Sequence, residues 1–238
     1  LKATMTRSKL TTAALLTILT LSTSGCIIHV GGQDNNDSDN DSDESNYSSV
    51  FGGVDVSKNK QVGDLSSVNG NITIQDNVSA RDVDVVNGDV EIGNNVQVRD
   101  VSTVNGDIQT QTFLSVKRDV STINGNISFG ADSIIGRDVV TVNGDIFLTQ
   151  TFVSDDIKTK NGSVTLAKGS IVDGNIEFES RNDDGWWGDT SSEHTPPILT
   201  IDATSDVKGK IILFQMVTLN IEDPALLAKV ERHYRKQE

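Results

Sequence analysis

The sequence is poor in cysteine and in aromatic residues. Its 238 residues include one cysteine, and only 5% of them are aromatic. A single cysteine excludes an internal disulfide and any zinc site built from several thiolates. The hydrophobic share of 35% is low for a large globular core. Val, Ile, Asn, Asp, Gly and Thr are plentiful, and this composition favours thin β layers joined by polar turns.

Positive charge is scarce as well. The chain has 20 Lys and Arg residues against 34 Asp and Glu residues, which gives a formal net charge of −14 and a pI near 4.5. Such a surface repels phosphate backbones. We therefore expect no nucleic acid among the partners.

The apolar run near the N-terminus, residues 13–21, is too short to cross a bilayer as a mature helix. Lys2, Arg7 and Lys9 precede it, and small residues follow it up to Cys26. A basic head, an apolar middle and a small-residue end are typical of an export signal, so we assign residues 1–25 to a signal peptide.

This leader resembles a bacterial lipoprotein signal with its lipobox, although Thr23 stands where Leu is usual and Leu21 lies two places further back. The resemblance implies that Cys26 is lipidated and becomes the mature N-terminus, anchored in the cell envelope. Ile27 after the cysteine favours the outer membrane. The alternative is an ordinary signal peptide followed by an incidental cysteine.

Residues 26–49 are predicted to form a disordered acidic tether. The stretch from Gly31 to Ser49 contains no Lys or Arg and has six acidic residues, Asp34, Asp37, Asp39, Asp41, Asp43 and Glu44. Like charges with little apolar surface do not collapse into a core. The alternation of Asp with Ser lacks the Gly and the terminal Glu of a calcium-binding EF-hand loop.

The middle of the chain is a repeat. An Asn-Gly pair recurs every 18 or 19 residues, at Asn69, Asn87, Asn105, Asn124, Asn143 and Asn161. A second column of Asp-Val type runs beside it, as in Arg99-Asp100-Val101. Antiparallel hairpins would use the Asn-Gly turns alone, whereas parallel coils stack every column on itself and reward identical residues. Asn and Gly also accept the positive φ that we expect at such corners.

We therefore predict an all-β protein with a single parallel β-solenoid over residues 50–222, of about eight coils of 18–19 residues and right-handed by default. A long loop, residues 179–197, replaces one corner. Asp223 and Pro224 are an N-cap and first-turn pair, so residues 223–238 are predicted to form a helix. A cap over the last coil is the first interpretation, and a basic helix that binds a membrane or a partner is the second.

Most repeated polar residues have a structural explanation. Stacked Asn side chains bond along a solenoid, and the arginines beside the Asp column can neutralise it. A second carboxylate column lacks such arginines and is interrupted by Asn71, Asn126 and Ser163. Its members are weak calcium candidates: Asp89, Asp107 and Asp145. We expect no cofactor.

The inserted loop is the candidate binding site because it alone breaks the repeat. The residues proposed for it are Asp183, Asp184, Trp186, Trp187 and Asp189. The two tryptophans either pack against the solenoid or bind a glycan, a lipid headgroup or a protein. The three histidines, His29, His194 and His233, are scattered and lack a repeated Ser or Cys partner, so we expect no catalytic site.

The repeated columns, from Val54 to Ile221, resemble adhesin-like β-solenoid domains of bacteria. The later coils, such as Ile171 to Ile176, also resemble the polymer-forming bactofilins. These resemblances imply a non-enzymatic scaffold or adhesion lipoprotein, with the membrane, an envelope protein or a glycan as partner. Carbohydrate binding or carbohydrate chemistry through the Trp loop and bactofilin-like self-association are the alternatives.

Overall fold

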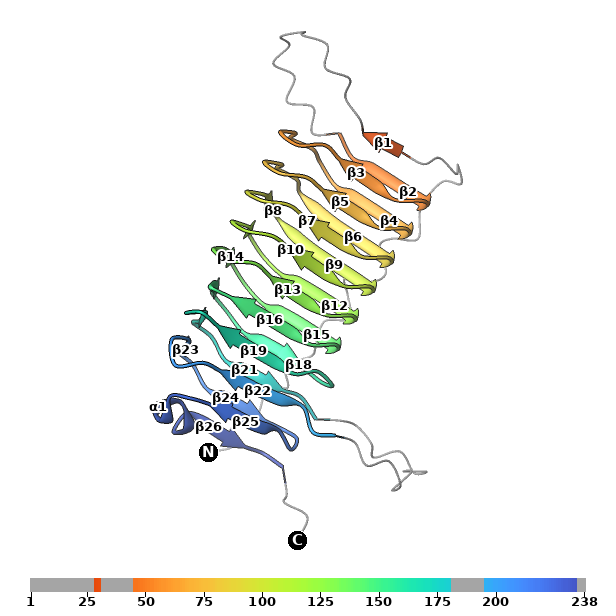
Figure 1. Cartoon of the computed structure of the whole chain (residues 1–238). Helices are drawn as coiled ribbons and strands as arrows, with labels where there is room; N and C mark the ends of the chain where they lie inside the picture. Colours follow the sequence, from red (N-terminus) through yellow and green to blue (C-terminus); the bar gives the residue numbers. More distant parts are fainter. Residues whose placement is uncertain (1–27, 31–44, 181–194, 235–238) are drawn as a thin grey trace, which may run out of the picture.

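The computed structural model describes residues 28–30, 45–180 and 195–234. They form an all-β parallel solenoid of about nine turns, close to the eight full coils predicted (Figure 1). The leader, Cys26 and the proposed loop residues 183–189 lie outside the described residues, so the predictions made for them stay predictions. No helix among the described residues is long and apolar enough to span a membrane.

Each turn contributes strands to sheets that run along the solenoid. Sheet A consists of β1 (Ile28–Val30), β3 (Val54–Val56), β5 (Ile72–Ile74), β7 (Val90–Ile92), β10 (Ile108–Thr110), β13 (Ile127–Phe129), β16 (Ile146–Thr149), β19 (Val164–Ala167), β22 (Ile198–Ile201) and β25 (Thr218–Ile221). Sheet B consists of β2 (Tyr47–Phe51), β4 (Leu65–Asn69), β6 (Asp82–Asn87), β9 (Asp100–Asn105), β12 (Val120–Asn124), β15 (Val139–Asn143), β18 (Ile157–Thr159), β21 (Ile176–Phe178), β24 (Ile211–Leu213) and β26 (Val230–Arg232).

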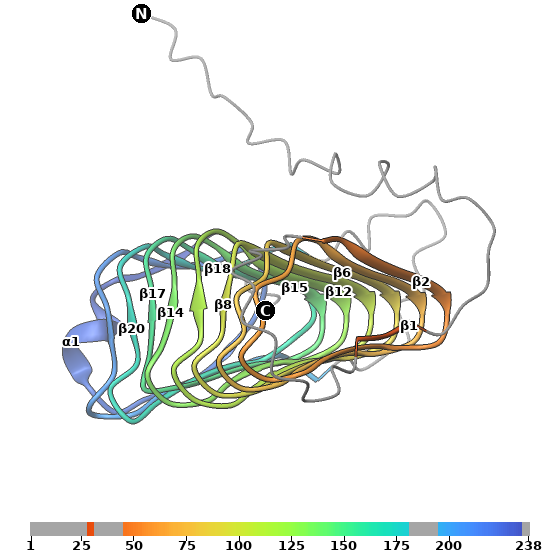
Figure 2. The same ribbon diagram turned by 90° about the horizontal axis from the view of Figure 1, so that it is seen from above.

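Sheet C is shorter and consists of β8 (Gln97–Val98), β11 (Ser115–Val116), β14 (Ser133–Ile135), β17 (Thr151–Val153), β20 (Ile171–Val172) and β23 (Asp206–Val207). The chain visits the sheets in the order B, A, C within a turn. Figure 2 shows β8, β14, β17 and β20 together on one flank of the solenoid. The structure also begins before the predicted boundary at residue 50, because β1 pairs with β3 and β2 pairs with β4.

The core is a filled column of aliphatic side chains. In sheet B, Val101 pairs in register with Val83 and Val120, and all three are buried. Strand residues alternate between this interior and the solvent, as the period of two requires. Identical inward residues thus stack on one another at each turn, which explains why whole columns of the sequence repeat.

The Asn-Gly corners join sheet B to sheet A. The predicted asparagine ladder is present: the Asn105 amide donates to Asn87 Oδ1 at 2.9 Å, and Asn124 donates to Asn105 at 2.7 Å. The expected positive φ at these asparagines is wrong. Positive φ at non-glycine residues occurs instead at the corner between sheets A and C, at Asn59, Asn77, Asn95, Phe113, Asp132, Gln150 and Lys168.

Glycine is needed at the Asn-Gly corner for a different reason. A Cβ on Gly106 would lie closer to the Gly88 carbonyl than the 3.0 Å that real Cβ atoms respect. The backbones of successive turns approach too closely here for any side chain. Close approach, rather than a left-handed conformation, therefore explains this glycine.

The C-terminal helix is much shorter than predicted. α1 (Pro224–Leu227) is a single turn, with the Asp223 carboxylate accepting from Ala225 N at 2.9 Å and with Leu226 buried. The chain then forms β26, whose Ile211 to Val230 pairing extends sheet B, because pairing with β24 outweighs the helical pattern of these residues. α1 occupies the place that sheet C strands hold in earlier turns, so sheet C ends at β23.

Candidate functional site

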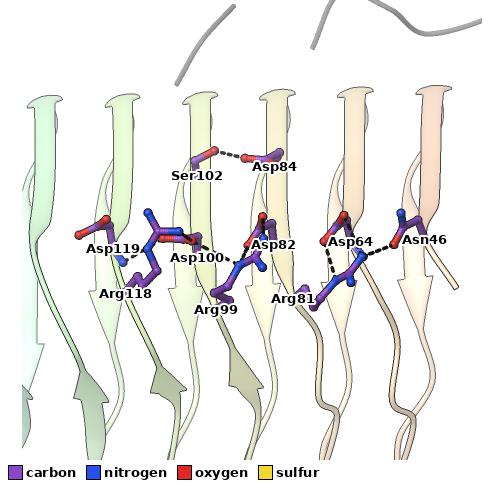
Figure 3. A network of polar contacts seen from close by, with 10 residues as sticks. All are labelled: Asn46, Asp64, Arg81, Asp82, Asp84, Arg99, Asp100, Ser102, Arg118 and Asp119. Carbon is purple, nitrogen blue, oxygen red and sulfur yellow. Dashed lines mark hydrogen bonds and ion pairs between the residues drawn. The ribbon is translucent and has the colours of Figure 1, made fainter. Parts of the chain in front are cut away.

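The corner between sheets C and B carries a ladder of charged side chains (Figure 3). Arg81 Nε lies 3.1 Å from Asp64 Oδ1, and Arg118 Nη1 lies 3.1 Å from Asp100 Oδ2. Arg99 binds Asp82 in the same way. Each arginine thus reaches the carboxylate of the preceding turn. The repulsion expected between stacked carboxylates is relieved by these arginines, as the sequence predicted.

The carboxylates of this ladder also hold the backbone. Asp100 Oδ1 accepts the N–H of Asp119 at 3.1 Å, and Asp156 Oδ1 accepts the N–H of Asn175 at 2.8 Å. Burial alone would raise the pKa of Asp156, but hydrogen bonds from Asn175 and Lys158 outweigh it and lower that pKa. Both charge and hydrogen-bonding capacity are used within the solenoid, so the ladder is structural.

The weak calcium candidates have the same structural role. Asp89 Oδ1 accepts the N–H of Asp107 at 2.9 Å, and Asp107 Oδ1 accepts the N–H of Asn126 at 2.7 Å. Asp145 accepts from Ser163 N at 2.8 Å. Across the described part of the chain, no three His, Cys, Asp or Glu residues are grouped to hold a metal ion. Backbone bonding therefore accounts for these carboxylates without a cation.

Asp84 is the exception among the carboxylates. It lies on the outer face of sheet B at the position held by Ser66 and Ser102 in the adjacent turns. The Ser102 hydroxyl donates to it. Burial raises the pKa of Asp84, and the carboxylates of Asp82 and Asp100 add to that rise. The ionised form of Asp84 therefore destabilises the folded state.

The outer face of sheet A contains a groove of about 430 Å³. Polar side chains line it, including Gln75, Glu91, Gln109 and Gln111. Gly93 occupies the turn between those of Gln75 and Gln111, at the same position of the repeat. Lys58 and Asp76 also lie in the lining. Amides, carboxylates and an ammonium group can hydrogen-bond a polar ligand, so this groove offers a polar contact surface.

No family model, no curated protein and no solved structure matches the chain.

The base of the inserted loop shows a residue that sequence reasoning missed. Gln215 is nearly buried, and its Nε2 donates to the carbonyls of Glu179, at 2.9 Å, and Lys160. The side chain closes the corner where the Asn-Gly pair is absent. The one sequence signal for this role is alignment of the repeat, which places Gln215 at the position that Asn161 holds in an earlier turn.

The structure does not bring the described histidines together. His29 lies in β1, at the first edge of sheet A. His233 follows β26, at the other end of the molecule, and stacks on Phe214 with ring centroids 5.1 Å apart. His194 lies outside the described residues. The described chain thus offers no histidine pair for acid and base chemistry.

Proposed function

We propose that this chain is a non-enzymatic scaffold lipoprotein of the bacterial cell envelope, which presents a rigid β-solenoid for adhesion or spacing. One observation carries the proposal: the polar columns bond turn to turn along the rod, as in the asparagine ladder from Asn69 to Asn161. Such bonding stiffens a rod and leaves few polar groups for chemistry. At about 4.8 Å per turn, the rod is roughly 40 Å long.

The anchor is the part of this proposal that a single experiment decides. The intact sequence is expressed with its leader in a bacterial host, and the envelope is separated from the soluble fraction. We expect the protein in the outer membrane, with an N-terminal peptide that begins at a lipid-modified Cys26. A Cys26→Ser variant should lose both the lipid and the membrane fraction. Unmodified Cys26 in a soluble cytoplasmic protein would overturn the proposal.

A polymer-forming role is the second candidate, and the end of the solenoid favours it. Among the described strands, β25 and β26 have no neighbour on their outer edges. Leu219, Ile221 and Val230 are only partly buried there. Free strand edges with apolar side chains invite addition of further strands. Electron microscopy of the purified protein should then show filaments that lengthen with concentration, whereas rods of constant length would exclude this role.

The glycan-binding alternative depends on Trp186 and Trp187, which lie outside the described residues. The polar groove on sheet A gives it some support, because amides and carboxylates bond sugar hydroxyls well. Adhesion to a glycan is compatible with the scaffold role. The Trp186→Ala and Trp187→Ala variants test whether glycan binding occurs.

A further inference from the structure

Sheet C presents seven successive outward positions without charge. In register along the sheet these positions hold Gln61, Ser79, Gln97, Ser115, Ile134, Phe152 and Ile171, and the next position is Asp206, which Lys208 and Lys229 neutralise. We refer to the seven uncharged residues as the sheet C strip. Outward positions of sheet A include Asp55 and Glu91, and those of sheet B include Asp84, Lys158 and Glu177.

The last three positions of the strip are apolar and reach the solvent. Ile134 is 53% exposed, and Phe152 and Ile171, which follow it in register, are half-buried. Their neighbours in sequence, such as Ile135 and Val172, fill the core. A stack of three outward apolar residues is unusual on a face that has no need of them for folding. In a molecule with a net charge of −14, an uncharged strip lets a second acidic copy approach with little repulsion.

Charges of opposite sign lie on the two flanks of the strip. In the turn of Ile134, Asp132 precedes the strip and Arg137 follows it. In the turn of Ile171 the order is reversed, with Lys168 before the strip and Asp173 after it. All four side chains are exposed. Within the described chain, neither Lys168 Nζ nor the Asp173 carboxylate takes part in an ion pair.

This pattern is self-complementary under a twofold axis parallel to the solenoid. Such an axis places the preceding flank of one copy against the following flank of the other at the same level, an isologous contact. Lys168 of each copy then faces Asp173 of the other, and Asp132 faces Arg137. Ile134, Phe152 and Ile171 each pack against their own counterparts.

We propose that two copies of this chain associate side by side and in parallel through the sheet C strip. An antiparallel pair centred on Phe152 would also match the apolar residues and would bring Asp132 near Lys168 and Arg137 near Asp173, but it would set Lys117 against Lys208. The parallel pair avoids that repulsion, and the Asp206 residues that it places together are each neutralised by Lys208 and Lys229. The charge pattern thus favours the parallel pair. In it, both N-terminal ends lie at the same end of the dimer, where two lipid anchors could enter one membrane, although the dimer itself does not depend on the anchor.

The strip is small, and its size sets the strength of the dimer. Seven turns at about 4.8 Å and a width of about four residues give roughly 400 Å² on each copy, half of what a standard stable interface buries. We therefore expect a dissociation constant on the order of 100 μM in solution. Confinement of both copies to one surface would raise their effective concentration and favour the dimer.

Cysteine cross-linking tests the dimer and its orientation. In a Cys26→Ser background, the engineered cysteine is the only thiol of the chain. Ile134→Cys and Ile171→Cys, each alone, should give disulfide-linked dimers under mild oxidation at least about tenfold faster than a control. Phe147→Cys is that control, because Phe147 is 42% exposed on the outer face of sheet A. Equal rates for all three would overturn the proposal, as would cross-linking only in a mixture of Ile134→Cys with Ile171→Cys.

Charge reversal supplies a second readout without cysteine chemistry. Lys168→Glu should weaken dimerisation about tenfold in sedimentation equilibrium, since two attractive contacts become repulsive. Adding Asp173→Lys to the same chain should restore it, because both contacts regain opposite charges. Far-ultraviolet circular dichroism checks that each variant keeps its β structure. A monomer at all concentrations up to about 1 mM, or a double variant no tighter than Lys168→Glu, would refute the assignment.

Discussion

The glycines of the Asn-Gly corners provide the sharpest test of how turns stack. Gly106 is not in the left-handed region, so alanine is compatible with its backbone conformation. The added Cβ, however, would press into the carbonyl of Gly88 in the preceding turn. That carbonyl cannot retreat freely, because Gly88 N donates to Asn105 O at 3.0 Å and Gly106 N donates to Asn124 O at 3.0 Å.

The cost of Gly106→Ala follows from these contacts. Overpacking against a fixed backbone costs about 1–3 kcal/mol, and weakening two backbone hydrogen bonds adds about 1 kcal/mol each. We therefore expect a loss of about 3–5 kcal/mol in the free energy of unfolding. Gly169 is the matched control: it has φ +82 but no atom closer than 3.8 Å to an added Cβ. Alanine there should cost only about 1–2 kcal/mol, for backbone conformation.

Urea unfolding followed by circular dichroism measures both variants on the same chain. The stacking argument requires Gly106→Ala to be the more damaging substitution. A Gly169→Ala variant that is equally or more unstable would show that corner conformation, and not close approach, is what the glycines provide.

Three further predictions concern other parts of the chain. Asp84→Ser should stabilise the fold at pH 7, since the pKa of Asp84 is raised by burial; the gain should vanish below about pH 4, where the carboxyl is protonated in both states. Leu226→Ala should cost about 2–4 kcal/mol in thermal or urea unfolding, because Leu226 is the buried residue of α1 and is only 2% exposed. Trp186→Ala or Trp187→Ala should abolish retention on envelope glycans, with the β signal intact, if the glycan-binding alternative holds; unchanged retention would exclude it.

The architecture could be predicted because a solenoid repeats its physical constraints. Each turn imposes the same demands on Val101, Asn105 and Gly106, so their columns are visible without any relative for comparison. The reason for a column was harder to infer than its existence. The Asn-Gly pair predicts positive φ at Asn105, whereas the left-handed corner lies at residues as different as Asn95 and Phe113. A position that tolerates such variety leaves no repeated signal in the sequence.

The ends and the surface were less predictable for a related reason. Residues 230–232 have helical spacing with Leu226 and Leu227. They form β26 instead, because they pair with the edge of sheet B that β24 leaves open. Propensity is local, whereas strand pairing depends on what the fold has already built. Similarly, Ile134 and Ile135 are adjacent and alike, and only the turn geometry shows that one is exposed and the other buried.

A solenoid position that holds the same residue in every turn has its bonding capacity used by the turns on either side. Asn105 donates to Asn87 and accepts from Asn124, so little of its amide is left for a ligand. A column that changes character carries different information. The step from Ser115 to Ile134 exchanges a hydroxyl for an apolar side chain that points away from the core, and the turn gains no burial by it. What lies outside the turn explains such a change, and for this reason recognition is expected at sheet C rather than at the repeated Asn-Gly corner.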